Sequence, residues 1–412
     1  MKDVEGNKMS GSARIRVIQV ALITAIALFG DAMLFIVLPL YYSQFGLTAL
    51  WQIGLLLSIN RLIRLPLNHW LPGFTGAFHL RTGLLIAMIL ASLTTFSYGV
   101  FPIFWVLFIA RMLWGVAWSL LRMGGFLTII EVSSDDNRGK HVGMYNGLWG
   151  IGGLVGMLAG GLLADQMSIM PITTVFALCA AACIPVVWRV IPNVLITNDD
   201  SKQAVTNDKF SFTSYHTIIL LTSLGMGFLI MGLFASTLSP LIETYYIEEL
   251  TVLGVVIGAA TVAGVLQAVR WSWDPFVAPL VGKWMDRLEH SHYLLFVPLS
   301  GGAIVFFLIG WTSELYLLLL LLVVFQLIST FFSTTVDTIA TEAASKTDRV
   351  KFMMWHTIMV DTGAAVGPLL SYLLLSTFDG SLSIVYFIAS VIFLAYTCVW
   401  AYAAKKIKTK RT

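Results

Sequence analysis

Charged side chains are scarce in this chain. Asp, Glu, Lys and Arg make up 11% of its 412 residues, whereas 58% of the residues are hydrophobic. A soluble globular domain carries about 25% charged residues, and soluble monomers avoid large exposed apolar patches. The composition therefore excludes an ordinary soluble protein and favours a protein that lies in a lipid bilayer.

Cysteine is also rare, and its positions argue against metal or disulfide chemistry. Cys179, Cys183 and Cys398 fall within apolar stretches and lack metal-ligand spacing, so we interpret them as small packing residues. No nucleotide-binding loop or nucleophile elbow is present. We therefore expect no metal, no cofactor and no catalytic residue, and we disfavour an enzyme or an ATP-driven pump. The net charge of +3 gives no reason to expect nucleic-acid binding.

Long apolar runs fill most of the chain. A hydrocarbon core about 30 Å thick needs about 20 helical residues to cross, and lipid forces the backbone to satisfy its own hydrogen bonds. We therefore predict an all-α integral membrane fold with twelve transmembrane helices. The predicted spans are 16–40, 51–72, 81–99, 102–130, 142–164, 171–191, 215–240, 251–281, 293–311, 314–340, 351–377 and 382–404.

The basic residues divide sharply between the gaps. Twenty of the 25 Lys and Arg residues lie before the first span, in every second gap after it, after the last span, or within three residues of the span ends that border those gaps, and none lies in the other gaps. Cytoplasmic loops of membrane proteins carry the excess of Lys and Arg. The pattern therefore predicts a multi-pass protein of the cytoplasmic membrane with both termini in the cytosol. The remaining basic residues lie inside spans; they are Arg61, Arg64, Arg111, Arg122 and Arg270.

The two halves of the chain resemble each other. A polar linker at 192–214 separates a predicted N-terminal six-helix bundle, 1–191, from a C-terminal bundle, 215–412. Many transporters build a central site between such parallel repeats. Six pairs of residues recur at offsets of 206 or 211 residues. They are Arg64 with Arg270, Asn68 with Asp274, Gly76 with Gly282, Arg81 with Arg287, Gly152 with Gly363, and Gly156 with Gly367.

Glycines in the fifth span carry a family resemblance. Their spacing resembles the antiporter motif of the major facilitator superfamily, with Met157 at the position of the motif's proline. Small residues of this kind let two helix backbones approach closely in a membrane, although Gly-rich packing is also common in membranes generally. The motif residues are Gly143, Gly152, Gly156, Gly160 and Gly161, and Gly363, Gly367 and Pro368 in the eleventh span form a partial second copy.

A cytosolic loop signature of the same family follows the eighth span. Gly282, Asp286 and Arg287 fit it, and the resemblance implies that this loop latches the bundles on the cytosolic side. The copy after the second span is degraded, because Leu80 replaces its aspartate. Asp135, Asp136 and Arg138 are then alternative partners for a latch, or simply residues of a solvated loop.

Asp31 and Arg111 are the predicted proton-coupling residues. Arg111, followed by Gly115, resembles the fourth-helix motif of proton-coupled members, and Asp31, followed by Pro39, resembles the acidic first-helix motif of exporters. The helical rise places both in the outer half of the membrane. Burial disfavours a charged carboxylate and a nearby arginine favours it, so Asp31 is a candidate proton carrier. The alternative is a permanent structural ion pair.

Arg61 and Arg64 have two interpretations. They lie three residues apart on one predicted helix face, beside Asn60, and this arrangement suits a cationic clamp for an anionic substrate. The resemblance instead places the second and eleventh helices at the bundle interface, where Asp361 would neutralise one arginine.

Three further features complete the candidate set. Arg270 and Asp274, four residues apart, are expected to pair locally, also at the bundle interface. Trp114 and Trp118 share a helix face with Arg111 and Arg122. They would form an aromatic, cationic substrate wall, or else serve only in packing.

Together these observations predict a secondary transporter that works by alternating access. We expect a monomer in the lipid bilayer that exports a small anionic or amphiphilic organic molecule in exchange for protons. The alternatives are proton-linked uptake of a metabolite, or a lipid flippase on the same fold.

Overall fold

The computed structural model describes the chain except for residues 1, 68–78, 134–137, 194–212, 247–249, 253, 288–290, 346 and 410–412. At residues 2–13, 138–139, 250, 252, 275, 286, 291, 349–350 and 406–409 it describes the backbone alone. Most of the predicted linker therefore lies outside the described residues, as do Asn68, Gly76, Asp135 and Asp136.

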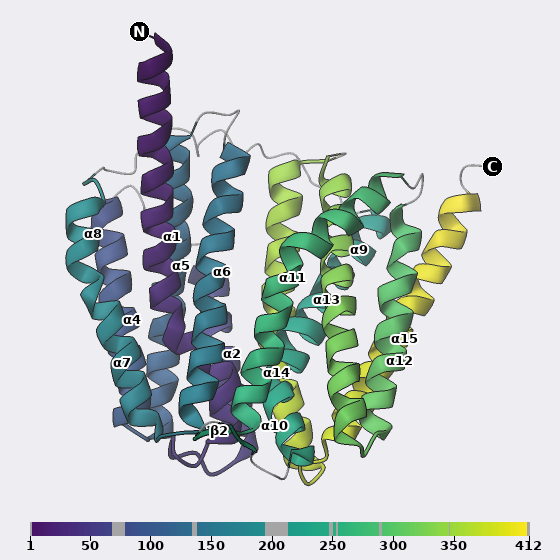
Figure 1. Ribbon diagram of the computed structural model, residues 1–412. Helices are drawn as coiled ribbons and strands as arrows, with labels where there is room; N and C mark the ends of the chain where they lie inside the picture. The colour runs from purple at the N-terminus through teal and green to yellow at the C-terminus, as the bar shows by residue number, and fades with distance from the viewer. Residues whose placement is uncertain are drawn as a thin grey trace. The chain divides into compact units, whose positions relative to one another are not determined.

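The described chain is almost entirely helical (Figure 1). In its first part the helices are α1 (Lys2–Leu40), α2 (Leu50–Leu62), α4 (Leu80–Val100), α5 (Phe104–Val132), α6 (Arg138–Ala164), α7 (Ile169–Ala182) and α8 (Ile184–Val190). Then follow α9 (Ser214–Met226), η3 (Gly227–Phe234), α10 (Ala235–Tyr245), α11 (Ala259–Arg287), η4 (Ser291–Leu295), α12 (Phe296–Trp311), α13 (Leu315–Ala344), α14 (Arg349–Thr377) and α15 (Leu382–Thr409).

Ten helical stretches of the described chain are long and apolar enough to cross a bilayer. The other two predicted spans correspond to α2 and α11. α2 has 13 residues, and undescribed residues begin shortly after it. α11 has 29 residues, which is long enough to cross a bilayer. It contains five charged residues, the last of them Arg287, and these lower its hydropathy.

The eighth predicted span begins differently from the sequence-based expectation. Residues from 251 onward were expected to be helical, but β1 (Leu250–Val252) and β2 (Val255–Ile257) form an antiparallel hairpin ahead of α11. β-branched side chains favour strands, and Gly254 has a φ of +80° that suits a tight turn. The helix starts only at Ala259.

Two predicted spans contain internal irregularities. The sixth is divided into α7 and α8 at Cys183, just before Pro185, because proline lacks the N–H that would continue the helical ladder. The seventh consists of α9 and α10 joined by η3, a π-helical stretch. Stretches of this kind are rare and often lie at functional sites.

The chain forms two compact units. Unit 1 comprises Met1–Thr48, Ile63–Lys202 and Leu250–Ala268, and unit 2 comprises Ala49–Leu62, Gln203–Glu249 and Val269–Thr412. α2 thus belongs with the second unit and the start of α11 with the first. The division at the 192–214 linker into two six-helix bundles stays a prediction.

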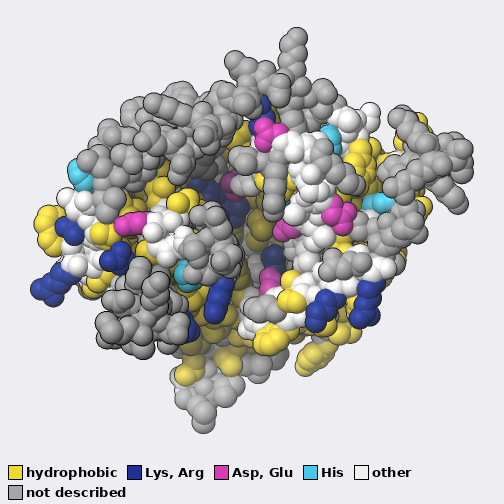
Figure 2. Space-filling model, turned by 90° about the horizontal axis from the view of Figure 1, so that it is seen from above, with side chains coloured by type: hydrophobic (Ala, Val, Ile, Leu, Met, Phe, Trp, Pro, Cys, Tyr) yellow, Lys and Arg dark blue, Asp and Glu magenta, His cyan; other side chains and the backbone are white. Residues whose placement is uncertain are grey.

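Many large apolar side chains of the described helices are exposed. Trp105, Trp188, Trp311 and Tyr316 are all more than half exposed, which suits contact with lipid rather than water. Figure 2 looks along the helices onto one end, where Lys, Arg, Asp and Glu side chains are visible.

Candidate functional site

A buried ion pair joins α1 to α5 in unit 1. Arg111 Nη1 donates to Asp31 Oδ1, and the side chains are 1% and 10% exposed, respectively. Removing a charge from water is costly unless an opposite charge and further hydrogen bonds offset the loss. The two residues that the sequence singled out for proton coupling are therefore direct partners.

Tyr98 of α4 completes this group. Its side chain is 1% exposed, and its hydroxyl, which has no hydrogen-bond partner among the described residues, lies near enough to Arg111 and Asp31 to be affected by both charges. Three helices thus contribute a carboxylate, a guanidinium and a phenol to one buried cluster, which we call the coupling cluster. Sequence reasoning missed Tyr98, because nothing in its local context separates it from an interfacial tyrosine.

Arg122 lies in a second cluster of unit 1, among aromatic rings. Its Cζ lies 5.8 Å from the ring centroid of Trp118, 5.1 Å from that of Phe126 and 5.4 Å from that of Trp149. Guanidinium groups at such distances are attracted to ring faces. We call these four residues the aromatic cage. They are all partly exposed.

The cage is held by contacts among its own rings. Trp118 and Trp149 meet edge to face at 5.3 Å, and Trp149 Nε1 donates to Asn146 Oδ1 at 3.0 Å. Trp149 and Phe126 were not among the predicted site residues. The helical periodicity that linked Trp118 to Arg122 could not find Trp149, which comes from α6.

Trp114 has a different environment from Trp118. It is 1% exposed and lies in the hydrophobic core of unit 1 with Leu84 and Leu121. Its position corresponds to the packing interpretation, since a ring this deeply buried presents no face to a substrate.

Arg61 lies opposite Asp361 in unit 2, where α2 packs against α14. The Nη1–Oδ1 distance is 4.0 Å, and the side chains are 19% and 24% exposed. Asn60 is buried on the same helix. The geometry corresponds to the expected neutralisation of one arginine by Asp361.

Arg64 does not continue the helix of Arg61. α2 ends at Leu62, and Ile63 lies in a turn before residues 64–67 become helical again. The shared-face argument for a clamp assumed one continuous helix, and the break removes that basis. Arg64 is buried and belongs to unit 1.

Arg270 and Asp274 lie close together on α11, as their spacing predicted. Arg270 Nε is 3.9 Å from Asp274 Oδ2, and Thr330 of α13 donates its hydroxyl hydrogen to Asp274 Oδ1. Thr330 is a partner that sequence spacing could not supply.

Most motif glycines of α6 lie where a side chain would collide with a neighbouring helix. A methyl group on Gly152 or Gly156 would overlap the α1 backbone at Ala25 or Phe29. On Gly160 it would meet the side chain of α1 residue Met33, and on Gly161 the backbone of α11 residue Ala260. Gly143 is the exception, because nothing lies within 4 Å of its methyl position.

The partial copy on α14 shows the same close packing in unit 2. Gly363 faces the backbone of Leu224, and Gly367 faces that of Gly232 in η3. Pro368 lies inside α14, and its carbonyl approaches Gly54 of α2. These glycines permit the helix contacts that the motif resemblance predicted.

The cytosolic loop motif is only partly described. Gly282 has open space around its methyl position, Arg287 is exposed at the end of α11, and the side chains of Asp286 and Arg138 lie outside the described residues. In the degraded first copy, Arg81 Nε donates to the carbonyl oxygen of Ile191 at 2.6 Å. Arg81 therefore ties the start of α4 to the end of α8.

An additional junction in unit 1 surrounds Asp165, at the end of α6. Its Oδ1 accepts from Tyr41 at 2.7 Å. Its Oδ2 accepts from the backbone N–H of Gly258 at 2.9 Å and of Thr261 at 2.8 Å, and from the Thr261 hydroxyl at 2.5 Å. A carboxylate at a helix N-terminus satisfies amides that lack helical partners. Asp165 follows the fifth predicted span, 142–164, and was not among the predicted site residues.

The sequence model of the Major Facilitator Superfamily matches residues 20–274 and 274–412. The chain belongs to this superfamily. It therefore has the all-α membrane fold of that family, as the resemblance had predicted.

The chain is also similar to multidrug resistance proteins of two bacteria. It is 26% identical over 268 residues to the multidrug resistance protein MdtG of Salmonella paratyphi A and to that of Escherichia coli K12. The chain spans 63% of the length of these relatives, and the match covers 63% of the chain.

Solved superfamily structures share the fold at much lower identity. A bacterial homologue of the human lysosomal transporter Spinster aligns with a TM-score of 0.76 at 14% identity, covering 96% of this chain and 97% of that one. The nucleoside transporter NupG aligns at 0.72 and 13%, covering 94% and 98%.

Proposed function

We propose that this superfamily transporter exports a small amphiphilic or anionic organic compound in exchange for protons, by alternating access. We place it in the cytoplasmic membrane with both termini in the cytosol. The similarity to the MdtG multidrug resistance proteins supports export, as does the glycine pattern of α6. The single observation that carries proton coupling is the buried Asp31–Arg111 pair.

The pair can exchange a proton but has little surface for an organic molecule. Arg111 is 1% exposed, and the Asp31 side chain is 10% exposed. A proton on Asp31 would cancel its charge, and the nearby Tyr98 hydroxyl, which has no hydrogen-bond partner within the described part of the chain, would then be available to the guanidinium as a neutral partner. The proton therefore acts on the contact between α1 and α5 rather than by displacing substrate directly.

The energies involved are comparable. Breaking a buried ion pair by removing one charge costs about 3–5 kcal/mol. One elementary charge moving down a potential of 100 mV releases about 2.3 kcal/mol. A single proton could thus drive the break only if Arg111 gained another partner, and the nearby Tyr98 hydroxyl is the group we propose for it.

The aromatic cage is the proposed recognition group. Its guanidinium and indole rings are partly exposed, and together they offer a cation and flat apolar faces. An amphiphilic compound that carries a ring and an acidic group matches this chemistry.

The test is transport by purified protein in liposomes. The substrate is first identified by a thermal-stabilisation screen, because a ligand that binds the folded state raises stability with its concentration. We expect Asp31→Asn to abolish uphill transport driven by a pH gradient, while exchange of labelled for unlabelled substrate continues. Asp361→Asn is the matched control, since Asp361 also faces an arginine but in unit 2. Unchanged gradient-driven transport by Asp31→Asn would refute the proposal.

Proton-linked uptake of an anion is the second candidate. One observation favours it. The Asp31 carboxylate neutralises the charge of Arg111, so a proton on Asp31 leaves unit 1 one charge more positive. That change would favour binding of an anion together with the proton. Substrate and protons moving in the same direction would select this candidate.

A further inference from the structure

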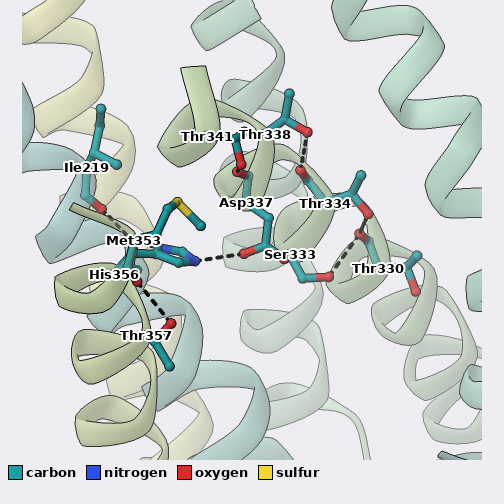
Figure 3. A network of polar contacts seen from close by, with 11 residues as sticks. Ile219, Thr330, Ser333, Thr334, Asp337, Thr338, Thr341, Met353, His356 and Thr357 are labelled. Atoms are coloured by element: carbon teal, nitrogen blue, oxygen red, sulfur yellow. Dashed lines mark hydrogen bonds and ion pairs between the residues drawn. The ribbon is translucent and has the colours of Figure 1, made fainter. Parts of the chain in front are cut away.

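A hydrogen-bonded chain in unit 2 links three helices through a histidine (Figure 3). His356 of α14 lies between Ser223 of α9 and Asp337 of α13. Its Nδ1 is 2.8 Å from Ser223 Oγ, and its Nε2 is 3.1 Å from Asp337 Oδ1. Ser223 Oγ also lies 2.9 Å from the carbonyl oxygen of Ile219.

The heavy-atom positions fit two different numbers of protons. In the first state the Ser223 hydroxyl donates to Nδ1, and Nε2–H donates to the Asp337 carboxylate. In the second state both ring nitrogens carry protons. Nδ1–H then donates to Ser223 Oγ, the hydroxyl turns to donate to Ile219, and Nε2–H still donates to Asp337. The second state holds one more proton and needs only a rotation of the hydroxyl.

Exposure provides a route for that proton. The His356 side chain is 8% exposed, whereas that of Asp337 is 59% exposed. The carboxylate can therefore meet water while the ring stays packed against its neighbours. Histidine is also the side chain whose ordinary pKa lies closest to physiological pH.

We propose that Ser223, His356 and Asp337 form a proton-binding site of unit 2, which takes up one proton at His356 Nδ1. The proposal deepens the proposed function, and its role in transport rests on that function. It would give the transporter a protonation site separate from Asp31, one that ties α14 to α9 and α13 most strongly when the imidazolium faces the carboxylate.

Other ionisable groups on the helices around α14 have been assigned to different contacts. Arg61 of α2 pairs with Asp361. Glu342 of α13 lies near enough to Tyr215 of α9 for the two side chains to interact electrostatically. η3 carries no ionisable side chain. The remaining ionisable groups on α9, α10 and α15 whose side chains are described are His216, Glu243, Tyr245, Tyr386, Tyr396, Cys398, Tyr402 and Lys405. Asp337 is the carboxylate within hydrogen-bonding distance of His356.

The equivalent position in unit 1 supports this reading. Tyr145 precedes His356 by 211 residues, the same offset that relates the paired glycines of α6 and α14. The Tyr145 hydroxyl donates to Leu121 of α5 at 3.3 Å and lies 3.5 Å from Thr24 Oγ1 of α1. Both residues therefore bridge two neighbouring helices. A phenol stays neutral near pH 7, so this position can change charge only in unit 2.

The test is nuclear magnetic resonance of the full-length protein in liposomes, with the histidine ring nitrogens labelled. The signal of His356 is identified by its loss in His356→Gln. At about pH 8 the ring should carry its proton on Nε2, and at about pH 5 it should carry protons on both nitrogens. Asp337→Asn should lower the ratio of doubly to singly protonated ring at a given pH, because the facing charge is removed.

His141→Gln is the matched control. His141 Nδ1 also meets a serine hydroxyl, that of Ser133 at 2.6 Å, and its loss should leave the His356 signal unchanged. A ring that stays singly protonated down to about pH 5, or a neutral ring protonated on Nδ1, would overturn the proposal. So would an unchanged ratio in Asp337→Asn. The measurement needs neither substrate nor gradient, so its outcome is independent of the export proposal.

Discussion

The Asp31–Arg111 pair permits a quantitative prediction. Asp31→Asn keeps the size of the side chain and one acceptor oxygen but removes the negative charge. Arg111, which is 1% exposed, is then left as a buried cation. Removing one member of a buried ion pair costs about 3–5 kcal/mol, and we expect the lower end, about 3 kcal/mol, because the amide oxygen still accepts a hydrogen bond. Arg111→Met should cost about as much, since it leaves a carboxylate only 10% exposed.

The double variant should be less damaging than the two single changes together. Asp31→Asn with Arg111→Met removes both charges and fills much of the same volume, and such replacements are often neutral or stabilising. We therefore expect a total loss of about 1–2 kcal/mol and a coupling energy of several kcal/mol between the two positions.

The assay is denaturant unfolding of the four proteins in detergent, with a matched cycle on Arg61 and Asp361. That second pair is longer, at 4.0 Å, and about a fifth exposed on both sides, so its coupling energy should be at most about 1 kcal/mol. If the losses from Asp31→Asn and Arg111→Met simply add in the double variant, the reasoning about the buried pair is refuted.

Three further predictions concern the packing and the cage. Gly156→Leu should abolish folding or transport, because its Cβ would lie 2.6 Å from the carbonyl oxygen of Phe29. Gly143→Leu should be tolerated, because no described atom lies within 4 Å of its Cβ position. Equal loss in both variants would contradict the close-packing account. Asp165→Asn should weaken the start of α11 by about 1 kcal/mol and speed amide hydrogen exchange at residues 258–261, and unchanged exchange would count against it. Arg122→Ala should reduce substrate affinity about tenfold, and Arg122→Lys should have an intermediate effect. Thermal stabilisation at graded ligand concentrations measures both. Wild-type affinity in both variants would show that the aromatic cage does not bind the substrate.

The helices could be predicted from the sequence because a backbone buried in lipid must form its own hydrogen bonds, which a helix does within one segment. The run from Leu84 to Tyr98 is helical within α4, and the spacing of Arg270 and Asp274 correctly indicated an i,i+4 pair. Both inferences depend on neighbours in the sequence, where the geometry of a helix is fixed.

Contacts between distant segments could not be predicted in the same way. Trp149 reaches Arg122 from another helix, and His356 lies 133 residues beyond Ser223. Asp31 and Arg111 were suspected from motifs, and the comparable depth of the two residues suggested a pairing. No local pattern indicated Tyr98, whose importance arises only from the charges that three-dimensional packing brings to it.

The turn at Ile63 shows a second limit. A hydrophobic run specifies a membrane segment but not the places where its helix is interrupted. The shared-face argument for Arg61 and Arg64 assumed unbroken periodicity, and one turn residue removes that basis. The hairpin before α11 is a similar case, because short β-branched runs are compatible with either a strand or a buried helix.

Proton movement during substrate transport tests the central claim most directly. Liposomes containing the purified protein and a pH-sensitive dye would receive the substrate found in the stability screen on one side only. The account predicts that substrate entry drives protons the opposite way in the wild type, and that Asp31→Asn shows substrate exchange without proton movement. Protons that follow the substrate, or an Asp31→Asn variant that still moves protons with it, would contradict the account.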